Sequence, residues 1–73
     1  MIDITYDPEA DAVYMYFGRG KVARTEEAGP FIYDLDADGR VLGIEILAAS
    51  KVLAPGGWQT ARLPGETKFH AAE

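Results

Sequence analysis

The sequence predicts an α+β fold that is mostly β: an antiparallel β-meander of four to five strands with one short C-terminal helix. Three observations lead to this prediction. The 73 residues are enough for a single domain. Short runs of β-branched and aromatic residues are separated by turn-forming Gly, Pro and Asp. Within several runs, apolar residues alternate with polar ones, which is the period of a strand with one buried face.

The first strand is predicted at residues 2–6, where apolar and polar side chains alternate. Residues 7–11 (DPEAD) end this strand, because Pro8 fixes φ and has no N–H to donate to a ladder. Residues 12–17 (AVYMYF) are rich in aromatic and β-branched side chains and predict the second strand.

Residues 21–28 are polar and predict a short third strand at an edge of the sheet, where charges discourage aggregation. The fourth and fifth strands are predicted at residues 31–35 and 40–47. Between them, Asp38-Gly39 flanked by alternating apolar residues is a strong signal for a hairpin with a type I′ turn.

The turn also predicts the register of this hairpin. A two-residue loop at Asp38-Gly39 gives the pairs Leu35–Leu42, Tyr33–Ile44 and Phe31–Ile46. A four-residue loop shifts the pairs by two and keeps the same faces. All the large apolar side chains then share one side, which we expect to be the core face.

The opposite face is predicted to be half apolar. It carries Tyr14, Tyr16, Ile32 and Val41, mixed with Asp34 and Glu45. A second half-apolar face on a small sheet favours a dimer interface or partner surface, and these four apolar residues are the predicted interface. The alternative is that the C-terminal segment folds over this face.

Residues 48–53 predict the short helix, and Pro55-Gly56-Gly57 ends it. Residues 1–53 are therefore expected to form the β domain, and residues 54–73 a C-terminal extension. Three apolar residues in the extension are candidates for docking on the body or on a neighbouring chain: Trp58, Leu63 and Phe69. Without such docking the extension would be a mobile tail.

The formal net charge is −5, with ten acidic and four basic residues in positions 1–50. Phosphate binding needs clustered Lys and Arg, so this balance disfavours direct nucleic-acid binding. The predicted acidic surface comprises Asp7, Glu9, Asp11, Glu26, Glu27, Asp36 and Asp38. The apolar runs are too short to span a membrane, and the absence of cysteine and of a secretory signal favours the cytoplasm.

One segment matches a calcium-binding pattern. The EF-hand string D-x-D-x-D-G-x5-E is present as Asp34, Asp36, Asp38, Gly39 and Glu45. An EF-hand needs a helix on each side of its loop, but Gly29-Pro30 prevents an entering helix and residues 40–47 alternate as a strand. We therefore expect a plain hairpin turn, with no metal and no other cofactor.

Catalytic chemistry is not expected. The chain has one serine, Ser50, and one histidine, His70, and nothing in the sequence fixes the histidine beside the serine. A nucleophile needs a base within hydrogen-bond reach that is itself oriented by a third group. The sequence predicts no catalytic residues and a protein that is not an enzyme.

Three blocks together carry a family resemblance: ITYDPEADAVYMYF, KVARTEE and DLDADGRVLGIEILAASKVL. In this order they resemble the DUF2283 family of small bacterial and phage-borne proteins over residues 2–53. The resemblance implies a compact β-meander with a C-terminal helix. It also implies that the calcium-like string is a hairpin of the family, and it supplies no catalytic residues.

These features favour a non-enzymatic protein-interaction module that associates with itself as a homodimer. The alternative is a small acidic inhibitor, either antitoxin-like or a phage-encoded antagonist, which covers a basic nucleic-acid-binding surface of its target protein. A calcium or other metal binder is the third hypothesis and depends on the string at 34–45.

Overall fold

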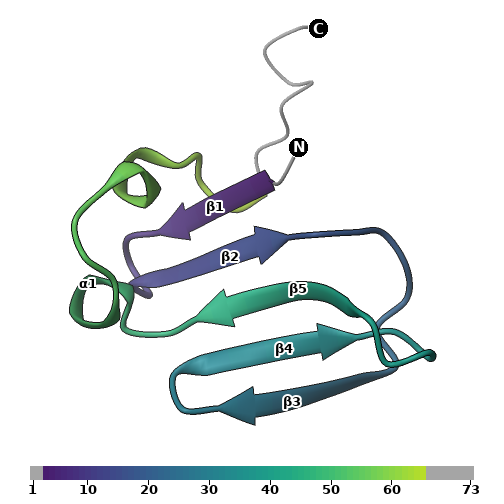
Figure 1. Ribbon diagram of the computed structural model, residues 1–73. Coiled ribbons are helices and arrows are strands. Elements are labelled where there is room, and N and C mark those ends of the chain that lie inside the picture. The colour runs from purple at the N-terminus through teal and green to yellow at the C-terminus, as the bar shows by residue number, and fades with distance from the viewer. Residues whose placement is uncertain (1–2, 66–73) are drawn as a thin grey trace, which may run out of the picture.

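The computed structural model describes residues 3–65 and arranges them as one five-stranded antiparallel sheet with two short helical segments (Figure 1). The elements are β1 (Asp3–Asp7), β2 (Ala12–Tyr16), β3 (Arg24–Ala28), β4 (Phe31–Leu35), β5 (Val41–Ile46), α1 (Ala49–Val52) and the 3-10 helix η1 (Gly57–Thr60). The predicted mostly β, antiparallel fold with one short helix is confirmed. Within the described residues, no helix is long and apolar enough to cross a membrane.

The order of strands across the sheet is β1-β2-β5-β4-β3, which differs from a simple meander. The connection at residues 17–23 is too long for a tight turn and passes the ends of β5 and β4 (Figure 1). The amides of Phe17 and Gly18 donate to the Leu42 carbonyl at 2.8 and 3.2 Å, and that of Ala23 donates to Leu35 at 2.8 Å. This crossover carries β3 to the far edge, as predicted for that strand, and leaves the place beside β2 to β5.

The β4–β5 hairpin confirms two of the three predicted pairs, Phe31–Ile46 and Tyr33–Ile44. The third is wrong, because Leu35 faces Val41 and a bulge makes Leu42 the extra residue. The predicted type I′ turn is also wrong: Gly39 is the only residue of the turn with positive φ, at 81°. The result is a three-residue loop with a left-handed glycine, and the bulge restores the predicted register beyond it.

Buried apolar side chains lie at both ends of the sheet: Leu35 and Leu42 are buried beside the β4–β5 turn, and the larger cluster lies at the other end. Val13 of β2 and Ile46 of β5 are 1% and 5% exposed, and Ala49 of α1 packs on them. Trp58 of η1 packs edge-on against Tyr6, with ring centroids 5.0 Å apart. Both helical segments stand at this end, beside the β1–β2 turn (Figure 1).

Part of the C-terminal extension docks on the body. Arg62 forms a parallel bridge with Thr5, accepts a hydrogen bond from the Tyr6 amide at 2.9 Å, and pairs with the Asp3 carboxylate. Of the three predicted docking residues, Trp58 packs on the sheet and Leu63 is 48% exposed. The third, Phe69, lies outside the described residues.

Candidate interaction surfaces

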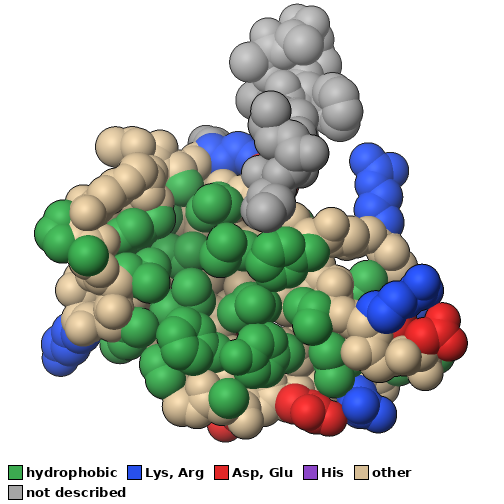
Figure 2. All heavy atoms as spheres, in the orientation of Figure 1, with side chains coloured by type: hydrophobic (Ala, Val, Ile, Leu, Met, Phe, Trp, Pro, Cys, Tyr) green, Lys and Arg blue, Asp and Glu red, His purple; other side chains and the backbone are tan. Residues whose placement is uncertain are grey.

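One face of the sheet is apolar and only partly covered, and we call it the open face. Strand alternation and the observed register place the following side chains on it: Ile4, Tyr6, Val13, Met15, Phe31, Tyr33, Ile44 and Ile46. Figure 2 shows a nearly continuous hydrophobic patch over β1, β2, β5 and β4. The sequence predicts this face as the core, and the structure gives it no complete second layer.

The open face is covered towards both of its ends. Leu53 and Trp58 pack over Val13 and Ile46 at the end that carries α1 and η1. At the other end Leu35 and Leu42 are buried, and Gly20 of the 17–23 connection lies close to Leu42. Between these ends, Met15, Ile44 and Tyr33 are only half-buried. A sheet with one apolar face is stable only when another layer covers that face, so four-residue helical segments leave this requirement partly unmet.

The opposite face is held together by a polar chain that crosses four strands. The Tyr14 hydroxyl of β2 passes over β5 and donates to Asp34 of β4, and Asp34 also accepts from the Thr25 hydroxyl of β3 at 3.0 Å. Gly43 makes this crossing possible, because a Cβ there would lie 2.6 Å from Cε1 of the Tyr14 ring. Burial and the Asp34 carboxylate raise the pKa of Tyr14 well above its ordinary value.

Three of the four predicted interface residues share the opposite face, and the fourth stands at the bulge. Tyr14 and Tyr16 are neighbours on the opposite face, with ring centroids 4.4 Å apart, and Ile32 lies on the same face across β5. Val41 stands at the bulge beside the β4–β5 turn and is 42% exposed. Beside the tyrosines is an open hollow of about 250 Å³, whose lining includes Thr5, Asp7 and Glu45 as well as the tyrosines.

Asp11 ties α1 to the first turn. Its carboxylate accepts from the Ser50 hydroxyl at 2.6 Å, from the Ser50 amide at 3.1 Å and from the Tyr6 hydroxyl at 2.9 Å. The Ser50 hydrogen bonds, then that of Tyr6, lower the pKa of Asp11. The hydrogen bond to Asp11 raises the pKa of Tyr6. Ser50, the one serine, therefore anchors α1 to the sheet, and His70 lies outside the described residues.

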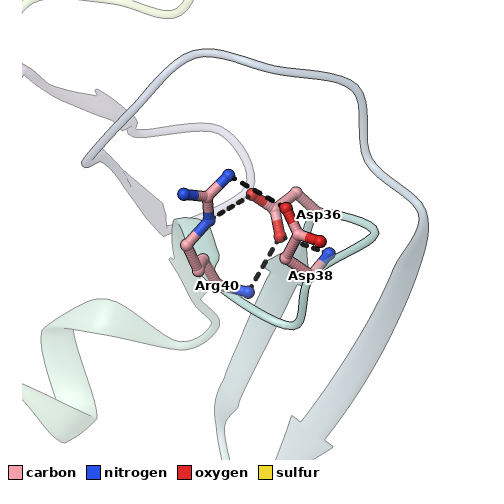
Figure 3. A network of polar contacts seen from close by, with 3 residues as sticks. All are labelled: Asp36, Asp38 and Arg40. Carbon is pink, nitrogen blue, oxygen red and sulfur yellow. Dashed lines mark hydrogen bonds and ion pairs between the residues drawn. The ribbon is translucent and has the colours of Figure 1, made fainter.

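The calcium-like string forms the turn of a hairpin between two strands, as the flanking residues predict. Asp36 accepts from the amides of Asp38 and Arg40, both at 2.9 Å, and from the Arg40 guanidinium at 3.0 Å (Figure 3). The Arg40 amide is the main cause of the lowered pKa of Asp36. Asp38 pairs with Arg40 at 3.2 Å. Within residues 3–65, no group of three or more His, Asp or Glu side chains is placed to hold a metal ion.

The predicted acidic surface is divided between separate places. Asp7 ends β1, Glu9 and Asp11 lie in the turn that follows it, and Asp36 and Asp38 lie in the β4–β5 turn at the other end of the sheet (Figure 1). Glu26 pairs with Arg24 at 3.0 Å on the edge strand β3, on the side of the open face. Glu27 points to the opposite face by strand alternation.

A different grouping of charge emerges from the register. Five carboxylates share the opposite face: Asp3, Asp7, Glu27, Asp34 and Glu45. Among the residues of the five strands, the open face carries only the Arg24–Glu26 pair as charged side chains, at its β3 edge. Charge and apolar area are therefore segregated to the two sides of the sheet, a division that sequence alternation alone indicates for β1, β4 and β5.

One comparison with known proteins gives a match, and the matched residues include all five strands. No curated protein and no solved structure matches the chain. The family model described as "Protein of unknown function (DUF2283)" matches residues 3–50, from the start of β1 into α1. This span includes both partners of the Asp11–Ser50 contact and of the Tyr14–Asp34 contact. The chain belongs to the DUF2283 family.

Proposed function

We propose that this chain is a non-enzymatic protein-interaction module whose contact surface is the open face. The observation that carries the proposal is the half-buried apolar row along the centre of the sheet, which includes Met15, Ile44 and Tyr33. A contiguous apolar patch on a soluble protein marks an interaction site, because leaving it in water is unfavourable by roughly 25 cal/mol per Å².

The proposed contact surface, the open face, lies on the other side of the sheet from the interface that the sequence predicts. On the opposite face, the Tyr14 hydroxyl donates to Asp34 and the Tyr14 ring packs against Tyr16, so much of the Tyr14 side chain already has partners in the chain. On the open face, Tyr33 is half-buried and lies away from the cluster under α1 and η1.

Site-specific photocrosslinking in the cells that make the protein tests the proposal. A benzophenone amino acid at position 33 should give a protein adduct, and the same group at position 16 on the opposite face serves as the matched control. Both positions are tyrosines in strands, so the chemical substitution is the same in the two variants. Adducts from position 16 and none from position 33 would reject the open face as the contact surface.

A second candidate function is the small acidic inhibitor of a basic nucleic-acid-binding protein. The five carboxylates on the opposite face favour it. Arg62 pairs with Asp3, but an excess of negative charge is left, and such an excess steers association with a basic surface. Glu27 and Glu45 are suitable for substitution. Replacing both by Gln should weaken a complex with such a target and reduce its dependence on salt, whereas unchanged binding would exclude this face.

A further inference from the structure

We infer that the partner on the open face is a second copy of this chain, with the two sheets packed face to face as a sandwich. The inference rests on the proposed function, since it names the occupant of the same surface. Three features carry it: the missing layer, the placement of charge, and the area of the face.

The missing layer has the form of a sheet. The shortest principal extent of the described fold is 19 Å against 35 and 32 Å for the other two, so the molecule is a slab. Two sheets that pack face to face lie about 10 Å apart and interdigitate their apolar side chains. A second open face supplies such a layer over Met15, Ile44 and Tyr33, which the described chain leaves half-buried.

The charge distribution allows two acidic copies to approach in this orientation. Each copy carries a net charge of −5. The five carboxylates of the opposite face point outward in a face-to-face pair, so the thickness of two sheets separates them. Arg24 and Glu26 at the rim have opposite signs, so they can exchange partners across a two-fold axis.

The area of the face fits a weak, reversible dimer. Five strands about 4.8 Å apart and five residues long give a face of roughly 24 by 17 Å, or about 400 Å² before side-chain relief, and part of this face is already covered by Leu53 and Trp58. Two copies therefore remove at most about 800 Å² of flat area, which is below the limit of about 1,000 Å² for a stable specific interface. Pleating and the adjoining surfaces of Trp58 and Leu53 add to this figure. We therefore expect reversible dimerisation.

Size-exclusion chromatography with light scattering on the purified full chain tests the inference over a concentration series. The expected mass at high micromolar concentration is twice the chain's 7.9 kDa. Tyr33→Glu should raise the dimer Kd by at least about 100-fold, because burying the unpaired charge twice by symmetry costs several kcal/mol. Tyr16→Glu introduces the same charge on the opposite face and should leave the Kd within about threefold.

Photocrosslinking of the purified chain is a second test that remains valid if Tyr33→Glu fails to fold. The benzophenone group at position 33 should give an adduct of two chains, and at position 16 none. A folded monomer of 7.9 kDa at high micromolar concentration, or a dimer that Tyr16→Glu dissociates and Tyr33→Glu does not, would overturn the inference. A monomer that still gives a position-33 adduct with another protein in cells overturns the second copy and leaves the proposed function standing.

Discussion

Replacing Gly43 by alanine tests whether the crossing of β5 by Tyr14 stabilises the sheet. A Cβ on Gly43 would lie 2.6 Å from Cε1 and 2.7 Å from Cζ of the Tyr14 ring. Carbon atoms do not approach so closely, so the ring must swing away from β5. The Tyr14 hydroxyl then loses the Asp34 carboxylate as its acceptor.

The expected change in the free energy of unfolding for Gly43→Ala follows from two opposing effects. A hydrogen bond to a charged group contributes about 1.5–3 kcal/mol. Alanine in a strand is favoured over glycine by about 0.5–1 kcal/mol, because the unfolded chain loses freedom. The net expectation is a loss of about 1–2 kcal/mol in the free energy of unfolding for Gly43→Ala.

A double-mutant cycle followed by urea denaturation separates the two effects. In a Tyr14→Val background there is no ring over β5, so Gly43→Ala should be neutral or stabilising by about 0.5–1 kcal/mol. All four proteins are compared at one chain concentration, because dimerisation would shift apparent stability. Equal destabilisation by Gly43→Ala in both backgrounds would refute the proposed contact between Gly43 and the Tyr14 ring.

Two further predictions concern the carboxylates that organise the turns. Hydrogen bonds from Ser50 lower the pKa of Asp11 below its ordinary value of 3.8, so its stabilisation is complete above that pH and is lost as pH falls through the folded-state pKa. Asp11→Asn should therefore weaken the acid dependence of the urea midpoint, and an unaltered acid limb would contradict this. Asp36→Ala should lower the urea midpoint more than Asp38→Ala, because Asp36 holds two turn amides as well as Arg40 and Asp38 contacts only the Arg40 side chain. Equal midpoints would show that the turn amides do not need Asp36.

Local patterns in the sequence are sufficient to predict the strands, the short helix and the faces of the β4–β5 hairpin. Strand alternation has a period of two, so Phe31 and Tyr33 must share a side with their partners whatever the loop does. The strand order depends instead on where the segment at 17–23 travels, which no local propensity determines. The bulge at Leu42 likewise compensates for a loop one residue longer than the expected one.

The contacts on the two faces were only partly predictable. Gly43 in the middle of a strand is a signal of close approach by another group, and that signal was available in the sequence. The partner of Asp11 was not, because Ser50 lies 39 residues away and reaches Asp11 only through the docking of α1. The predicted core face is only partly covered because α1 and η1 are each four residues long. Where these two segments pack is a tertiary feature that local sequence patterns do not predict.

The acidic string at residues 34–45 shows why spacing alone does not predict chemistry. On a strand, neighbouring side chains alternate between faces, so Asp34 joins the polar chain of the opposite face, whereas Asp36 lies beyond the end of β4 and binds the turn. Gly39 supplies the positive φ that the turn needs, and Glu45 is on the fifth strand opposite Tyr14. Asp34, Asp36 and Gly39 therefore each stabilise the hairpin or the sheet. The open face is different, because nothing in the described chain covers Met15, Ile44 and Tyr33 completely. Stability of the fold does not explain why this apolar area is only partly covered. We therefore propose this area as the functional surface.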